Sequence, residues 1–150
     1  MAAISPSEVR PGLVVHLDTQ NLRTLGGSLT NAMKNGNEDR AVAGPHYFLI
    51  VAVDPVSQGA TAVPLFSQSG PGSHKLDPAK KGGSLPLWTG AASYFSCWQH
   101  WRIPISDLVA ASAGEVTTPT DRCTYAESDP TTLNAIAAWA DKNRCPYRKP

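Results

Sequence analysis

The sequence predicts a mainly β fold with a C-terminal helix. Its clearest element is an apolar run at residues 48–53, followed by turn-forming residues 54–59 and a second apolar run at residues 60–66. Two β-prone runs joined by a short polar turn are typical of a β-hairpin. Because both runs are apolar at nearly every position, we expect this hairpin to lie inside a sheet that is covered on both faces.

The composition favours one globular domain over residues 1–150, which is long enough to bury a core of its own. Thirteen Pro and 12 Gly indicate many turns and therefore short strands. With 41% hydrophobic residues, the chain is too apolar to be disordered as a whole. The formal net charge of +1 argues against a protein that coats nucleic acid, so a phosphate ligand would need a local site.

The sequence shows no secretory signal and no stretch of the roughly 20 apolar residues that a membrane-spanning helix needs. We therefore expect a cytoplasmic protein that does not bind a membrane. Cys97, Cys123 and Cys145 are widely spaced and include no C-x-x-C pair, which argues against a zinc ribbon. Three reduced thiols are the simpler interpretation, and a disulfide between Cys123 and Cys145 is the alternative.

Before the hairpin, the sequence predicts one strand and one long loop. Residues 1–8 are interpreted as a lead-in without regular structure, and residues 13–17 (LVVHL) as a strand. Residues 18–43 are rich in Asn, Gly, Thr and charge, so we expect a long loop there, with one helical turn near residues 29–34.

After the hairpin, residues 70–83 are predicted to be a polar connection and residues 85–88 a short edge strand. Residues 93–103 (SYFSCWQHWRI) predict a strand with aromatic rings, His100 and Arg102 together on one face.

The C-terminal third is predicted to end in a helix. Residues 105–109 indicate a turn that leads into a short helix or a final strand, and residues 112–128 a loop. Residues 129–144 predict the helix, with an N-cap at Ser128 or Asp129 and an apolar stripe through Leu133 and Ile136.

Three short motifs follow one another along the chain. They are the strand start Pro11-Gly12-Leu13, the step Gly44-Pro45-His46 before the hairpin, and the segment Val63-Pro64-Leu65-Phe66-Ser67. In this order they resemble the MazF/PemK family of toxin endoribonucleases, and Trp101-Arg102-Ile103 is similar to the family's last core strand. The resemblance covers roughly residues 9–110.

The resemblance implies a small, curled β-barrel of the Src-homology-3 type, with a polar loop at residues 18–43 and the terminal helix at residues 129–144. It implies a homodimer that binds single-stranded RNA in a groove and cuts it without a metal or other cofactor. A cognate antitoxin protein is the further partner that it implies.

The resemblance also places a site at the two ends of the hairpin. His46 stands where the family has an Arg that stabilises the phosphate and transfers a proton. The family's catalytic Thr or Ser falls on Phe66 or Ser67, of which only Ser67 has a hydroxyl. A later Arg and Asp of PemK-like members are replaced by Ser96 and Trp98.

Metal-free RNA cleavage requires a base for the 2′-hydroxyl, an acid for the leaving oxygen and a cation or donor for the phosphorane. Imidazole suits the first two roles. We therefore predict a rebuilt site in which His46 and His100 act as base and acid and Ser67 as a donor. The candidate substrate-binding residues are Arg102, Lys75, Trp98 and Gln68.

The alternative function is a catalytically inactive barrel domain that binds a protein or nucleic-acid partner through the long loop and the aromatic strand. The replacement of the family's Arg and Thr favours it. His16 and His74 are interpreted as an ordinary strand residue and an ordinary loop residue. The sequence has no phosphate-binding glycine loop, G-x-S-x-G or H-E-x-x-H motif, which argues against nucleotide hydrolases, serine hydrolases and zinc proteases.

Overall fold

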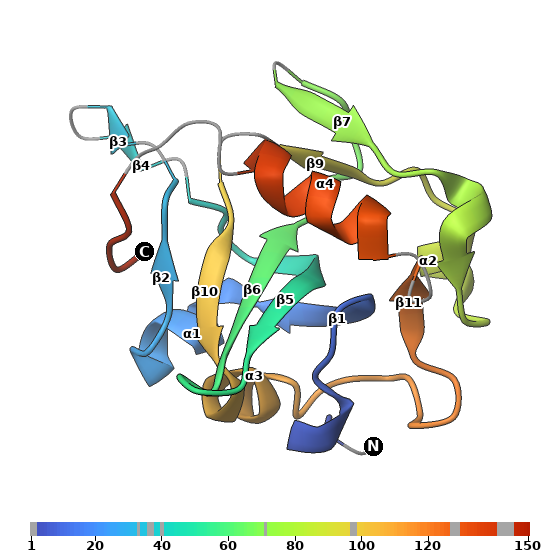
Figure 1. Cartoon of the computed structure of the whole chain (residues 1–150), viewed down its shortest axis with the longest axis horizontal. Coiled ribbons are helices and arrows are strands. Elements are labelled where there is room, and N and C mark those ends of the chain that lie inside the picture. Colours follow the sequence, from blue (N-terminus) through green and yellow to red (C-terminus); the bar gives the residue numbers. More distant parts are fainter. Residues whose placement is uncertain are drawn as a thin grey trace.

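The computed structural model describes residues 3–32, 34–35, 38–39, 41–70, 72–96, 99–126, 130–140 and 146–150. Within them the chain is mainly β, and its largest element is an antiparallel seven-stranded sheet in the order β2-β10-β6-β5-β1-β11-β8 (Figure 1). The strands of this sheet are β1 (Leu13–Asp18), β2 (Leu29–Thr30), β5 (Pro45–Asp54), β6 (Gly59–Pro64), β8 (Lys81–Gly82), β10 (Trp101–Pro104) and β11 (Cys123–Tyr125).

Shorter elements surround the sheet. Two further ladders pair β3 (Lys34–Asn35) with β4 (Glu38–Asp39) and β7 (Ser73–Lys75) with β9 (Tyr94–Ser96). The helices are η1 (Pro6–Glu8), α1 (Thr19–Leu25), η2 (Pro78–Lys80), α2 (Pro86–Thr89), α3 (Ile105–Ala111) and α4 (Pro130–Ala140). In the described ranges, no helix combines the length and the hydropathy that a membrane crossing needs.

The predicted central hairpin is confirmed. β5 pairs with β6 from Phe48 opposite Pro64 to Asp54 opposite Gly59, and β1 pairs with the other edge of β5. Phe48 belongs to the buried cluster on one face of the sheet, and Leu49 to the cluster on the other. A strand buried on both faces has a nearly continuous apolar sequence, which is the pattern that predicted it.

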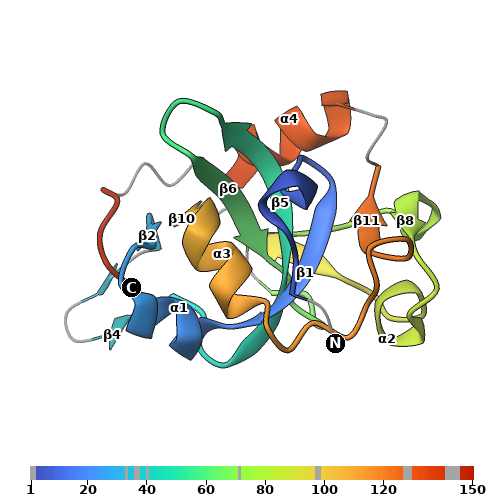
Figure 2. The same cartoon turned by 90° about the horizontal axis from the view of Figure 1, so that it is seen from below.

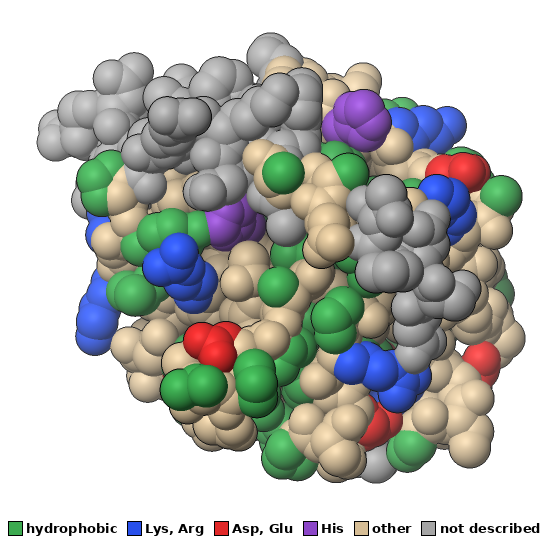
Figure 3. All heavy atoms as spheres, in the orientation of Figure 1, with side chains coloured by type: hydrophobic (Ala, Val, Ile, Leu, Met, Phe, Trp, Pro, Cys, Tyr) green, Lys and Arg blue, Asp and Glu red, His purple; other side chains and the backbone are tan. Residues whose placement is uncertain are grey.

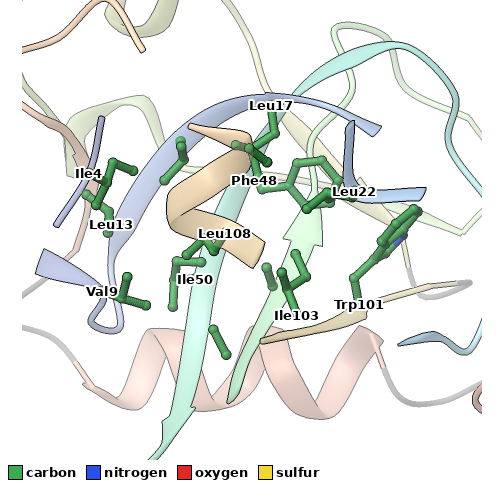
Figure 4. Close-up of a cluster of buried hydrophobic side chains, with 14 of the residues drawn as sticks. Ile4, Val9, Leu13, Leu17, Leu22, Phe48, Ile50, Trp101, Ile103 and Leu108 are labelled. Carbon is green, nitrogen blue, oxygen red and sulfur yellow. The ribbon is translucent and has the colours of Figure 1, made fainter. Parts of the chain in front are cut away.

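Helices cover the sheet from opposite sides (Figure 2). On one face, Leu22 of α1 and Leu108 of α3 pack with Phe48, Ile50 and Trp101 (Figure 4). On the other face, Trp88 of α2 and Leu133 and Ile136 of α4 pack with Leu49 and Val63. The C-terminal helix predicted from its apolar stripe therefore forms one of the two covering layers.

The sheet is open among the described strands. Its end strands, β2 and β8, each have one neighbour and do not pair with each other. The β5–β6 ladder shifts register between Ile50 and Ala52, and an irregularity of this kind bends a strand and increases its twist. The mainly β prediction is confirmed, and the described part of the chain shows a bent sheet without barrel closure.

Residues 18–43 contain more regular structure than the sequence indicated. The prediction of a helical turn near residues 29–34 is wrong, because Leu29 and Thr30 pair with β10 as strand β2. The helix lies earlier, at α1, where the Asp18 side chain accepts a hydrogen bond from the N–H of Gln20. Gly26 ends this helix with a φ of 83°, in the left-handed region that glycine adopts without strain.

Three other element predictions are corrected. Residues 86–89 form helix α2 instead of an edge strand, because Pro86 stands in the first turn, where its missing N–H costs nothing. Residues 93–103 are split between β9 and β10, which belong to different sheets. Residues 105–111 take the helical alternative as α3, and the predicted loop at residues 112–128 contains β11.

Of the three cysteines, the structure describes Cys123, so the prediction of a reduced thiol can be tested at that residue. Cys123 is a free, buried thiol on β11, and burial raises its pKa to about 12. It therefore takes no part in the alternative disulfide, whereas Cys97 and Cys145 lie outside the described residues.

The N-terminal segment is attached to the domain from Ile4, which corrects its interpretation as an unstructured lead-in. Ile4 is 1% exposed within the first core. Glu8 pairs with Arg122, whose Nε donates to Glu8 Oε1 over 2.8 Å, while the N–H of Ser5 donates to Oε2 of the same carboxylate. Arg122 holds the pKa of Glu8 at about 2, below its ordinary value of 4.5.

Glu8→Gln is expected to lower the free energy of unfolding at pH 7 by about 2 kcal/mol, because it leaves the buried Arg122 without its counter-charge. The folded-state pKa of Glu8 is depressed, so its contribution is complete above pH 4.5 and is lost as pH falls towards about 2. Urea unfolding of both proteins from pH 7 to pH 2.5 would measure this difference. A difference that does not change with pH would contradict the ion pair.

Candidate functional site

A cavity of about 220 Å³ opens beside the first residues of β5 and the residues that follow β6. Its lining comes from β1, from β5, from the segment after β6 and from the segment around α2. The lining residues are His16, Pro45, His46, Tyr47, Leu65, Phe66, Ser67, Leu87, Ala91, Ala92 and Ser93. The two ends of the hairpin thus meet on one side of the molecule, as the sequence predicted, and His46 and Ser67 share this cavity.

His46 enters the cavity from the start of β5. The turn before it depends on Gly44, whose φ of 76° lies in the left-handed region, and the Gly44 carbonyl accepts a hydrogen bond from the Thr19 N–H. The His46 Nδ1 atom lies 3.0 Å from the carbonyl oxygen of Leu65. A carbonyl can only accept, so we assign the proton of the neutral ring to Nδ1. Nε2 then keeps its lone pair and can accept a proton.

His16 is the second imidazole of the cavity. Because β1 and β5 are antiparallel, it stands opposite Tyr47, next to the pair formed by Leu17 and His46. Its ring contacts the Tyr47 ring edge-on, with centroids 4.8 Å apart, and its side chain is exposed. The His16 N–H donates to the carboxylate of Glu115, which is 4% exposed. The prediction that His16 is an ordinary strand residue is confirmed by its exposed position on β1, and its place in the lining of this cavity depends on a strand pairing that the sequence does not show.

Hydroxyl groups complete the polar lining. Ser67 is exposed at the cavity, and the phenol of Tyr47 is half-buried. Burial raises the pKa of Tyr47, and the nearby Cys123 and Glu115 raise it further. The phenol therefore remains a hydrogen-bond donor at neutral pH.

Lys81 stabilises the segment after α2, which forms one wall of the cavity. Its ammonium group donates to the carbonyl oxygens of Trp88 and Ala91 and to the hydroxyl of Ser93, and it lies 4.1 Å from the centroid of the Trp88 ring. Burial lowers the pKa of Lys81. These three acceptors and the Trp88 ring hold the Lys81 ammonium group against the segment that follows α2. Ala91 and Ser93 of this segment line the cavity.

The remaining predicted site residues lie elsewhere. His100 is 5% exposed and does not line this cavity, and the Tyr147 hydroxyl lies 2.7 Å from its Nδ1. The guanidinium of Arg102 lies 3.6 Å from the centroid of the same Tyr147 ring. The structure therefore brings His100 and Arg102 together at Tyr147, and separately brings His46 and Ser67 together.

The other substrate-binding candidates are not gathered in the cavity either. Gln68 is exposed and follows Ser67 but is not a lining residue, and Lys75 lines a different cavity. Trp98 lies outside the described residues, so its predicted stacking with Arg102 does too.

The described residues that line the cavity include two histidines, a tyrosine, two serines and several apolar residues, and no Lys or Arg. Across the described ranges, His, Cys, Asp and Glu side chains form no group of three or more that could hold a metal ion.

Comparisons of the chain with models of protein families, with curated proteins and with solved structures found no match. The chemistry of the site therefore rests on its geometry.

Lys81→Met is expected to lower the free energy of unfolding by about 1–3 kcal/mol, because the carbonyl oxygens of Trp88 and Ala91 lose a charged donor. It should also increase amide hydrogen exchange in residues 87–93, the wall that Lys81 holds. Lys149→Met, at an exposed lysine near the C-terminus, is the matched control and should change neither measurement. Unchanged exchange in residues 87–93 would show that the wall does not depend on Lys81.

Proposed function

We propose that the protein is a metal-free endoribonuclease of the MazF/PemK type, with an acid–base pair made of His46 and His16. The observation that carries this proposal is that His46, His16 and Ser67 line one cavity. The cavity lies at the two hairpin ends where the resemblance expects the working groups. In this proposal His16 takes the acid–base role for which the sequence predicts His100.

The reaction is transesterification within the RNA strand. Nε2 of His46 removes the proton of a 2′-hydroxyl, and the 2′-oxygen forms a bond to the neighbouring phosphorus. The bond from phosphorus to the 5′-oxygen of the next nucleotide breaks, and the protonated His16 gives its proton to that oxygen. The products are a 2′,3′-cyclic phosphate and a 5′-hydroxyl. Only RNA has the attacking 2′-hydroxyl, so the reaction excludes DNA.

Donors near the cavity would hold the phosphate during this step. The hydroxyls of Ser67 and Tyr47 are neutral donors, and each imidazole is a charged donor while it carries its second proton. Phe66 and Leu87, which is 76% exposed, offer apolar surface for a base next to the cleaved bond. These groups suit a single-stranded substrate, whose unstacked bases can reach side chains.

The proposal extends to the finer fold and to the partners. The bend in β5 and the two covered faces of the sheet support a curled sheet of the Src-homology-3 type. A homodimer and a cognate antitoxin protein are the partners that the resemblance adds, together with single-stranded RNA.

His46→Ala and His16→Ala are each expected to lower the cleavage rate of a single-stranded RNA by about 10²–10⁴-fold, the usual contribution of a positioned acid or base. The measurement is gel analysis of an end-labelled oligonucleotide in the presence of EDTA. An oligonucleotide with one 2′-deoxy sugar at the cleaved position should remain intact. Added imidazole should restore part of the activity of His46→Ala, which would separate lost chemistry from lost folding.

Ser67→Ala should lower the cleavage rate by about tenfold, because it removes one neutral donor to the phosphate. Ser69→Ala, two residues further and outside the cavity lining, is the matched control and should cleave at the wild-type rate. Full activity of His46→Ala, or cleavage of the deoxy-substituted strand, would refute the acid–base pair.

A non-catalytic binding domain is the second candidate function, and one observation favours it. The described lining of the cavity includes no Lys or Arg to neutralise a phosphorane, and His46 replaces the family's Arg. In this case the wild-type protein would shift RNA in a binding assay and leave it uncut, and His46→Ala would weaken binding.

A further inference from the structure

A second cavity, of about 470 Å³, lies between the β7–β9 ladder, η2, β11 and helix α4. It shares no lining residue with the cavity at His46. Its lining residues are His74, Lys75, Leu76, Asp77, Lys80, Phe95, Tyr125, Thr132, Ala135 and Ile136. Its volume lies within the range of roughly 300–1,000 Å³ that is usual for small-molecule sites.

The inner lining of this cavity is apolar. Leu76, Phe95 and Ile136 are 1%, 3% and 4% exposed and belong to the second core of the domain. They come from three separate segments, so the cavity is part of the folded core and not a gap beside one loop. The apolar body of a ligand placed against this lining would leave water, which gains roughly 25 cal/mol per Å² of the ligand's apolar surface removed from water.

The outer lining is polar and mainly basic. The described residues of this outer lining include Lys75, Lys80 and His74 and one carboxylate, Asp77. The Asp77 Oδ1 atom accepts a hydrogen bond from the N–H of Ala79, so this carboxylate caps η2. Figure 3 shows a histidine and basic side chains close together over the region of β7. Among the described lining residues, two lysines face one carboxylate, and this excess of positive charge favours an anion.

Hydrogen bonds and a ring contact hold the basic groups and the lining around them in place. The Lys80 ammonium donates to the hydroxyl of Thr132 on α4, over 2.9 Å. The His74 ring lies 5.4 Å from that of Phe95, centroid to centroid. The Tyr125 hydroxyl accepts a hydrogen bond from the N–H of Asp77. Cations positioned above an apolar lining are the arrangement that recognises a molecule with a charged head and an apolar body.

We propose that this second cavity binds a small amphipathic anion, with an apolar body against Leu76, Phe95 and Ile136. Its carboxylate or phosphate head lies between Lys75, Lys80 and His74. This site is independent of the proposed ribonuclease reaction, because no residue is common to the two cavities.

Titration calorimetry with decanoate and with decyl phosphate tests the proposal and distinguishes the two head groups. At least one of them should bind about tenfold or more tightly than the neutral 1-decanol, because a charge-assisted hydrogen bond is stronger than a neutral one. Decyltrimethylammonium, with the opposite charge, should not bind. In NMR spectra the bound anion should shift the ring signals of His74 and leave those of His16 and His46 unchanged.

Two matched variants on α4 locate the binding. Ala135 is exposed and lines the cavity, so Ala135→Trp should fill the mouth and abolish binding of the anion. Ala138 is also exposed but does not line the cavity, so Ala138→Trp should bind as the wild type does. Lys75→Gln, at an exposed position, should weaken binding of the anion by about three- to tenfold and leave binding of 1-decanol unchanged.

Three results would overturn the proposal. They are no binding of either anion to the wild-type protein, binding of 1-decanol as tight as that of the anions, and equal binding to Ala135→Trp and Ala138→Trp. Circular dichroism of each variant shows whether it is folded, and RNA cleavage measured in parallel reports on the other cavity. The two measurements together therefore show whether a variant has lost anion binding and kept RNA cleavage, or the reverse.

Discussion

The central strand β5 is buried on both faces, and the rest of the fold depends on this constraint. Phe48 and Ile50 need an apolar layer on one side, and Leu49 and Val51 need another on the opposite side. Full burial of one such side chain stabilises the fold by roughly 1.5–3 kcal/mol. Helices α1 and α3 supply the first layer and α2 and α4 the second, so segments from the whole length of the chain converge on this strand.

The same constraint leaves the ends of the hairpin as places for polar chemistry. At the start of β5, His46 and Tyr47 are half-buried, and the fully buried stretch begins only at Phe48. The protein chain leaves β6 at Leu65 and reaches the surface at Ser67. Polar groups can remain solvated there and still be held by a rigid strand, which is what an acid–base site requires.

Several cations of this protein stabilise its folded structure. Arg122 pairs with Glu8, Lys81 donates to backbone carbonyls behind the wall of the first cavity, and Arg102 stacks on Tyr147. A buried cation is costly unless acceptors surround it, and those acceptors fix its position. The described lining of the cavity at His46 includes no Lys or Arg, so under the proposed function a phosphate would be held there by hydrogen bonds from His, Ser and Tyr side chains.

By itself, the sequence determined the elements whose pattern is local. The continuous apolar runs of the hairpin, the strand at residues 13–17 and the helical stripe through Leu133 and Ile136 each reflect burial within one segment. It also put His46 and Ser67 at the ends of the hairpin. For residues 93–103, recurring aromatic residues predict one strand, whereas the structure divides the segment between β9 and β10, which pair in different sheets.

Only the tertiary structure decided which histidine lines the same cavity as His46. The antiparallel register of β1 against β5 places His16 opposite Tyr47, and both His16 and His46 line the cavity, whereas His100 contacts Tyr147 in another part of the fold. Register and long-range contacts depend on the free energy of the whole packed domain, and no single segment of the sequence contains that information. The second cavity has the same origin, because its apolar lining and its cations come from segments that meet only after folding.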